Sequence, residues 1–113
     1  MKPKTRSWAG STVEEFLAQE MKDPAFRIAF SEARAKRIKK SLAEAIHETR
    51  KRRGLSQSVL SKRAKTTQAV VSRIENPDID YLPSLEVLAR LAGALDARLE
   101  IAFVPEKRAA SDR

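Results

Sequence analysis

Cysteine is absent from the sequence, glycine occurs only three times, and aromatic residues make up 5% of it. Without cysteine the chain has neither a disulfide framework nor a thiolate metal site. No long apolar run is present either, so we expect no signal peptide and no membrane-spanning helix. The length of 113 residues, 42% of them hydrophobic, indicates one small, mostly aliphatic core and excludes a two-domain enzyme.

Residues that carry enzyme chemistry are also scarce. His47 is the only histidine, and the sequence shows no paired carboxylates, no glycine-rich phosphate loop and no nucleophile constellation. We therefore expect a protein that is not an enzyme and that needs neither a metal nor another cofactor. The absence of cysteine and of a signal peptide predicts a cytoplasmic protein.

Acidic residues are sparse in the middle of the chain. The whole sequence has 23 Lys and Arg residues against 15 Asp and Glu residues, a formal net charge of +8. Residues 38–76 carry 10 basic and 3 acidic residues, a net charge of +7, whereas residues 1–37 carry +3 and residues 77–113 carry −2. Such a local excess favours a polyanion as the partner.

The spacing of apolar residues predicts a mainly α-helical chain. An N-terminal arm, residues 1–37, is expected to contain an amphipathic helix that ends near Met21 and a second helix that restarts at Asp23-Pro24. The next helix begins near Ile38, either separately or as a continuation of the preceding one, and ends at Gly54. Its apolar face is predicted to consist of Ile38, Leu42, Ala45, Ile46 and Thr49.

Three further helices are expected within a folded domain that spans residues 38–96. Ser56 and Thr67 are suitable N-caps for two short helices, and Pro83-Ser84 precedes a strongly periodic one. In the first short helix, Val59 and Leu60 are expected to point inward.

The apolar period changes to two near the C-terminus. Leu99, Ile101 and Phe103 alternate with Arg98, Glu100 and Ala102, which predicts a β-strand over residues 97–105. An isolated strand is unstable in water, so we expect these three apolar residues to pair with a second copy of the chain. A partner protein's sheet and the N-terminal arm are alternatives. Residues 106–113 are expected to be a disordered tail.

The two short helices carry the most specific sequence pattern. The first contains Leu55-Ser56-Gln57-Ser58-Val59-Leu60-Ser61, and the second contains Thr67-Gln68-Ala69-Val70-Val71-Ser72-Arg73-Ile74-Glu75-Asn76. Residues 38–95 thereby resemble the lambda-repressor/Cro/Xre class of helix-turn-helix proteins. The resemblance implies a five-helix, lambda-repressor-like domain that binds double-stranded DNA with its second short helix in the major groove.

Candidate DNA contacts follow from this arrangement. With Val71 and Ile74 facing the core, Gln68 is available to adenine and Arg73 to guanine. Ala69 is suited to a thymine methyl group, and Gln57 to a phosphate oxygen. The complete candidate set is Gln57, Lys65, Thr67, Gln68, Ala69, Ser72, Arg73 and Asn76. The alternative for each is an ordinary solvated side chain.

Three positions in this region have structural explanations. Thr67 also serves as a helix cap and Asn76 as a helix terminator. Lys65 stands where the class usually has glycine in a left-handed conformation, which costs a non-glycine residue about 1 kcal/mol. The resemblance also implies a structural ion pair between Arg50 and Glu75.

The chain as a whole resembles HigA-type antitoxins of bacterial toxin–antitoxin pairs. The resemblance is based on the order of elements and on two local segments, Lys22-Asp23-Pro24-Ala25-Phe26-Arg27 and Leu99-Glu100-Ile101-Ala102-Phe103-Val104. It implies a bacterial, nucleoid-associated protein that neutralises a small basic ribonuclease toxin of the RelE/HigB type and represses its own operon. The candidate toxin contacts are Phe16, Leu17, Met21, Phe26 and Phe30.

Other interpretations remain open at this point. The apolar residues of the arm are equally suited to packing on the protein's own core. The protein as a whole is either an antitoxin, a stand-alone Xre-type regulator, or an interaction adaptor that has lost DNA binding. As a DNA-binding protein it is expected to form a homodimer with two recognition helices about 34 Å apart.

Overall fold

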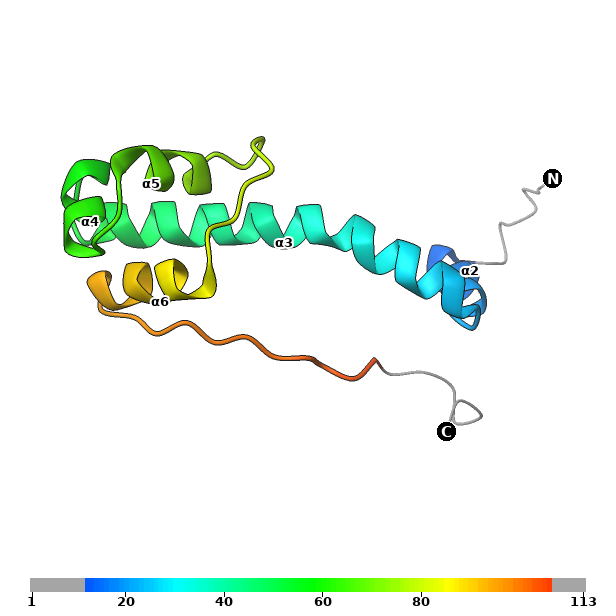
Figure 1. Ribbon diagram of the computed structural model, residues 1–113. Coiled ribbons are helices and arrows are strands. Elements are labelled where there is room, and N and C mark those ends of the chain that lie inside the picture. Colours follow the sequence, from blue (N-terminus) through cyan, green and yellow to red (C-terminus); the bar gives the residue numbers. More distant parts are fainter. Residues whose placement is uncertain (1–11, 107–113) are drawn as a thin grey trace. The chain divides into compact units, whose positions relative to one another are not determined.

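The structure is a computed structural model that describes residues 12–106. Over this range the chain forms five α-helices (Figure 1): α2 (Val13–Glu20), α3 (Pro24–Arg52), α4 (Gln57–Arg63), α5 (Gln68–Glu75) and α6 (Leu85–Ala94). The prediction of a mainly α-helical chain is confirmed. The implied five-helix domain is wrong in its count, because residues 38–96 contain only α4, α5, α6 and the C-terminal part of α3. The predictions for the start of the N-terminal arm and for most of the tail fall on residues 1–11 and 107–113, outside the described residues.

The chain divides into two compact units. The described part of the first comprises residues 12–34 and 104–106, and the second comprises residues 35–103. Helix α3 contributes its first turns to the N-terminal unit and the rest to the second. The helix that begins at Asp23-Pro24 therefore continues into the one expected near Ile38, which is the second of the two alternatives.

Polar caps define the helix ends of the N-terminal unit. Thr12 and Glu15 form a capping box at the start of α2, with Glu15 N donating to Thr12 Oγ1 at 2.9 Å and Thr12 N donating to Glu15 Oε1 at 3.1 Å. Asp23 accepts a bond from Ala25 N at 3.0 Å at the start of α3. No residue between 12 and 34 is buried, so this unit has no closed core within the described range.

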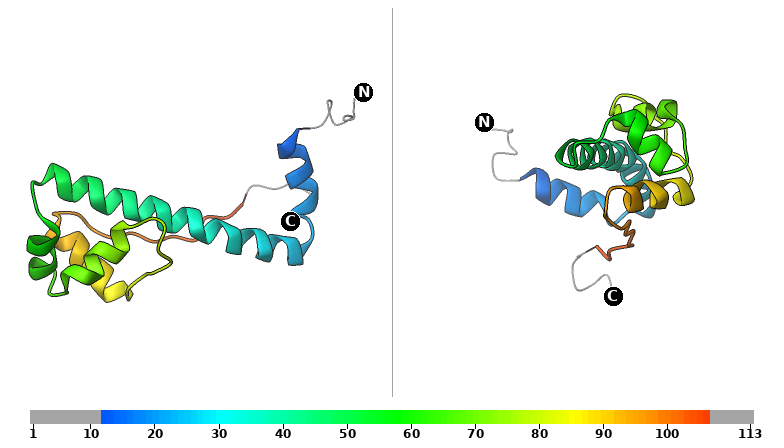
Figure 2. Two further views of the ribbon diagram at one scale, coloured as in Figure 1. Left: turned by 90° about the horizontal axis from the view of Figure 1, so that it is seen from above. Right: turned by 90° about the vertical axis from the view of Figure 1, so that its left-hand side faces the viewer.

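The second unit has a compact hydrophobic core. We call it the core cluster; its buried members are Ile46, Leu60, Ala64, Val71, Ile74, Leu88, Leu91 and Leu95. These residues come from α3, α4, α5 and α6 or their caps, which gather around the C-terminal part of α3, as Figure 2 shows. Because α4 and α5 both contribute, their relative orientation is set by packing and not by the short turn alone.

Left-handed residues end three helices of the second unit. Gly54, Lys65 and Asp96 have φ values of +69°, +59° and +57°. At the end of α3, for example, Leu55 N donates to Arg50 O at 3.1 Å, which satisfies a carbonyl that has no partner in the helix. The same pattern recurs after α4 and after α6.

The predicted apolar face of α3 was wrong at two positions. Ile38 is 65% exposed and Ala45 is also exposed, whereas Lys39 and Arg50 are buried in the same helix. The apolar spacing had placed Lys39 on the surface, whereas the resemblance had implied a structural ion pair for Arg50. The buried stripe instead includes two cations whose charges are neutralised by groups from distant segments. In α4, Leu60 is fully buried but Val59 is 39% exposed.

The predicted C-terminal β-strand is also wrong. The described residues contain no strand, and residues 97–106 have no regular secondary structure. Leu99 packs against the core cluster, whereas Ile101 and Phe103 are 64% and 100% exposed. A strand requires a neighbouring chain segment to complete its hydrogen-bond ladder, and the described residues supply none. The alternating pattern therefore does not make a strand within the single chain.

Candidate nucleic-acid interface

Helix α5 presents a polar face beside a buried one. Val71 and Ile74 are fully buried, which fixes the rotation of the helix about its axis. Four outward side chains, all of them exposed, remain: Gln68, Ala69, Ser72 and Arg73. This exposed surface is the part of α5 available to a ligand.

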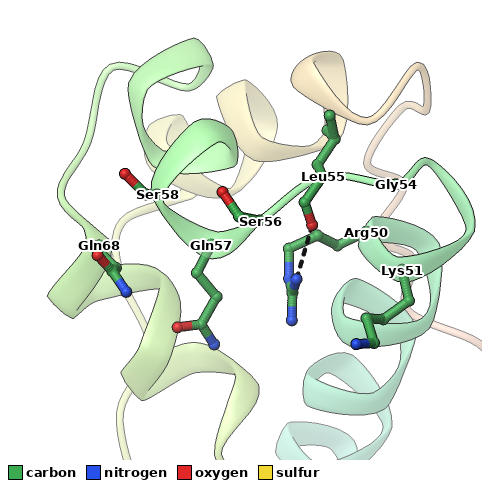
Figure 3. Close-up of a pocket in the computed structure, with 8 residues that line it drawn as sticks. All are labelled: Arg50, Lys51, Gly54, Leu55, Ser56, Gln57, Ser58 and Gln68. Carbon is green, nitrogen blue, oxygen red and sulfur yellow. Dashed lines mark hydrogen bonds between the residues drawn. The ribbon is translucent and has the colours of Figure 1, made fainter.

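A groove lies beside the first turn of α5 (Figure 3). It encloses about 530 Å³ and is lined by Arg50, Lys51, Gly54, Leu55, Ser56, Gln57, Ser58 and Gln68. Three helices contribute polar side chains to it: Lys51 from α3, Gln57 from α4 and Gln68 from α5. Amide and ammonium groups in such a setting suit an anionic ligand.

The basic surface is smaller than the sequence suggests. Of the ten basic residues between 38 and 76, Lys39 and Arg50 are buried. The other eight are exposed: Lys40, Lys51, Arg52, Arg53, Lys62, Arg63, Lys65 and Arg73. Eight exposed cations in this part of the second unit still provide a strong field for a polyanion.

Glu75, at the end of α5, receives several hydrogen bonds. Arg50 donates to both of its oxygens, from Nε to Oε2 at 2.6 Å and from Nη2 to Oε1 at 2.9 Å. Gln57 Nε2 donates to Oε1 at 3.2 Å, and His47 Nδ1 lies 3.0 Å from the same oxygen. Arg50 also donates to Leu55 O at 2.8 Å, the dashed line in Figure 3. The structure thus joins three helices through one carboxylate.

This network changes the ionisation of both partners. Burial raises the pKa of Glu75, but hydrogen bonds from Arg50, His47 and Gln57 outweigh burial, and the pKa lies below its ordinary value. The hydrogen bond to Glu75 raises the pKa of Arg50, against an opposing effect of burial. Both groups are therefore charged at neutral pH. Gln57, expected to bind phosphate, has its amide nitrogen engaged inside the unit.

The turn between α4 and α5 is held from α6. Lys65 adopts the left-handed conformation expected at this position, and its side chain is exposed. Arg90 Nε donates to Ala64 O at 2.8 Å, and Arg90 Nη2 donates to Lys65 O at 3.4 Å. Sequence reasoning missed Arg90 because nothing in the spacing of α6 identifies its partners, which lie about 25 residues earlier.

Thr67 and Asn76 take structural roles at the two ends of α5. Thr67 Oγ1 accepts a hydrogen bond from Val70 N at 3.2 Å, as an N-cap does. Asn76 Oδ1 accepts one from Asp78 N at 3.0 Å in the following loop. Both residues are exposed, so these bonds leave them accessible as well.

The C-terminal end of α5 is anchored by Lys39, which sequence reasoning had assigned to the basic surface. Lys39 is 5% exposed, and its Nζ donates to Asn76 O at 2.8 Å and to Ile79 O at 2.9 Å. A cation is favourable at a helix C-terminus, where carbonyl groups lack intrahelical partners. The buried residues of α3 follow one another at intervals of three or four positions: Lys39, Ala43, Ile46 and Arg50. This helical spacing is the sequence signal that places Lys39 on the buried face.

The candidate partner contacts of the N-terminal unit are partly or largely exposed. Phe16 is 59% exposed, and Leu17, Met21, Phe26 and Phe30 are half-buried. The rings of Phe26 and Phe30 stack with centroids 5.8 Å apart. None of the five belongs to the core cluster.

Between residues 12 and 106, no group of three or more His, Cys, Asp or Glu side chains is arranged to hold a metal ion. No helix in that range is long and apolar enough to cross a membrane.

A family model described as a helix-turn-helix domain matches residues 26–103. This range contains α4, α5 and α6 and nearly all of α3. Searches of curated proteins and of solved structures found no match.

Proposed function

Because the chain belongs to this helix-turn-helix domain family, we propose that it is a transcription regulator that binds double-stranded DNA at a specific sequence. The single observation that carries the proposal is the exposed polar face of α5, whose opposite face is locked into the core cluster. A rigidly held helix with outward polar side chains is what base recognition in a major groove requires.

Each part of the surface has a distinct role in this proposal. Gln68, Ala69, Ser72 and Arg73 face the base edges, and Arg73 is suited to the two acceptors of guanine. The exposed cations around them contact phosphates, which provides affinity and sets the register of the protein on the duplex. The candidate contacts to the DNA backbone that flank the base-reading face are Lys65, Thr67 and Asn76. Gln57 is the fourth, through the amide N–H that does not bind Glu75.

The test is selection of binding sites from duplex DNA with a randomised core, followed by affinity measurements at several salt concentrations. Arg73→Ala should relax the preference at one base pair, at a cost of about 1–3 kcal/mol for the selected sequence. Arg98→Ala removes an equal charge from an exposed residue outside the helix pair and should preserve the preference. Binding that is independent of sequence would overturn the proposal.

The selected sites also report the oligomeric state. We propose that the protein binds as a homodimer, since one α5 of eight residues contacts few base pairs. Two inverted half-sites about 10 base pairs apart, and a dimer in analytical ultracentrifugation, are the expected results. A single unrepeated half-site bound by a monomer would contradict this part.

We further propose that the regulator is an antitoxin that neutralises a RelE/HigB-like ribonuclease toxin and represses its own operon. Two observations support this narrower function. The sequence resembles HigA-type antitoxins, and the N-terminal unit presents apolar side chains without a closed core between residues 12 and 34. These residues carry five acidic and three basic side chains, a net charge of −2 that suits a basic partner.

Co-expression with the product of the neighbouring gene tests the antitoxin proposal. Co-purification that is lost in Phe16→Asp but retained in Gln68→Ala is the expected result, since Phe16 lies in the N-terminal unit and Gln68 on α5. A neighbouring gene that encodes no small basic protein, or a product that does not bind, favours the stand-alone regulator.

A further inference from the structure

We propose that Tyr81, in the loop between α5 and α6, is a positioning residue for Arg73 and contributes to DNA sequence discrimination through it. The inference rests on the proposed function, since it assigns a role to a residue that supports the base-reading face of α5. Tyr81 belongs to none of the sites described above, and its ring is held in place from two sides.

The first observation is the contact between the two side chains. Arg73 Cζ lies 5.8 Å from the centroid of the Tyr81 ring, within the range of a cation–π interaction. The guanidinium has five N–H groups in its plane, and a contact of its planar face with a ring does not use them. Such a contact is compatible with donation from Arg73 to guanine O6 and N7.

The second observation is that the ring itself is fixed. Tyr81 is half-buried and packs against the core cluster. Tyr81 N donates to Ile79 O at 3.0 Å, which tightens the loop just before the ring.

Lys39 secures the same loop from α3. Its Nζ donates to Asn76 O and Ile79 O and lies 3.5 Å from Arg73 O, so one buried cation binds both the end of α5 and the loop. In Figure 1 the loop passes across α3 on its way from α5 to α6. The position of the Tyr81 ring relative to Arg73 is thus set by α3 and the core cluster.

The consequence for binding is entropic. A long arginine side chain loses rotamer freedom when it binds a base edge, and a ring that restricts it beforehand reduces that loss. The benefit depends on the aromatic face and not on the hydroxyl group. Phenylalanine at position 81 should therefore preserve the discrimination between DNA sequences, whereas an aliphatic residue of similar bulk should lower it.

The experiment uses the full chain and the duplex that the wild-type protein selects from a randomised library. The discrimination ratio is the affinity for the selected duplex divided by the affinity for a duplex substituted at one base pair. It is measured by competition between the two duplexes, at the base pair whose preference Arg73→Ala relaxes. Tyr81→Leu should lower the ratio about 2- to 5-fold, and Tyr81→Phe should leave it unchanged within error. In the Arg73→Ala background, Tyr81→Leu should have no further effect.

A second measurement needs neither DNA nor the leucine variant. In the free protein, NMR should show the side-chain protons of Arg73 shifted upfield by the ring in the wild type and in Tyr81→Phe. Shifts typical of an unstructured arginine would overturn the proposal, whether or not Tyr81→Leu folds.

Other results distinguish a failure of the inference from a failure of the proposed function. An unchanged ratio in Tyr81→Leu overturns the inference, and so does a rise in affinity, which would mean that the ring holds Arg73 away from DNA. Equal losses for all sequences in Tyr81→Phe would indicate a hydroxyl contact to phosphate and also overturn it. If the wild type selects no sequence, the proposed function fails, while the upfield shift of Arg73 would still establish the restricted side chain.

Discussion

Replacing Glu75 by alanine tests how far the unit around α5 depends on one carboxylate. The Glu75 and Arg50 side chains are 4% and 9% exposed, and the substitution leaves the Arg50 guanidinium buried without its anion. Loss of one partner from a buried pair costs about 3–5 kcal/mol. The total free energy of unfolding of a domain is about 5–15 kcal/mol, so the variant should lose a large fraction of it.

Urea unfolding followed by circular dichroism measures this loss. With an m-value of about 1–1.5 kcal/mol per M for a small protein, the midpoint of Glu75→Ala should fall by roughly 2 M or more. Glu44→Ala, an exposed acid of α3, is the matched control and should stay within about 0.5 kcal/mol of the wild type. DNA binding should be lost in Glu75→Ala through unfolding and should recover partly in conditions that stabilise the folded state.

The double variant Arg50→Leu, Glu75→Leu distinguishes the net contribution of the ion pair to the free energy of unfolding from the cost of removing only one partner. Because neither buried charge remains, it should be more stable than either single variant. The argument would be refuted if Glu75→Ala matched the stability of the control, or if the double variant lost the full sum of the single losses.

The same carboxylate predicts a pH dependence. The pKa of Glu75 is lower in the folded state than in the unfolded chain, so its contribution to stability is present above the unfolded pKa, about 4.3. It is lost as the pH falls through the folded pKa. The pKa of Arg50 is raised in the folded state, so its contribution to stability has the opposite pH dependence. That contribution is fully present at pH values below the unfolded pKa of arginine. Glu75→Gln should therefore flatten the acid limb of the stability curve, and an unchanged limb would contradict the assignment.

Three further substitutions test the contacts around α5 by the same unfolding assay. Lys39→Met should lower the free energy of unfolding by about 1–3 kcal/mol, because Asn76 O and Ile79 O lose a charged donor. The neighbouring exposed Lys40→Met is its control, and an equal loss in the two variants would count against the anchor. Lys65→Gly should raise stability by up to about 1 kcal/mol, since glycine adopts a φ of +59° without a Cβ clash. A lower stability would show that the left-handed conformation is not strained. Arg90→Ala should cost about 1 kcal/mol through the two bonds to the α4–α5 turn, whereas Arg98→Ala should cost almost nothing.

The sequence by itself determined the features that depend on neighbouring residues. The N-caps Ser56, Thr67 and Ser84 satisfy N–H groups three residues ahead of them, so the starts of α4, α5 and α6 follow from local chemistry. The 3.6-residue period of α5 likewise assigned Val71 and Ile74 to the core. The left-handed conformation at Lys65 was expected only from the resemblance, since the class usually has glycine at this position.

Features that depend on distant segments required the tertiary structure. Lys39 is a typical surface residue by type, and only carbonyls supplied 37 and 40 residues away make its burial favourable. The pair of Arg50 with Glu75, 25 residues away, was implied by the resemblance and not by any local pattern. The alternation of Leu99, Ile101 and Phe103 suits a strand, but a strand forms only where a second segment offers its backbone. The tertiary structure likewise brought Tyr81 under Arg73, because a loop and a helix meet there through contacts that no sequence period encodes.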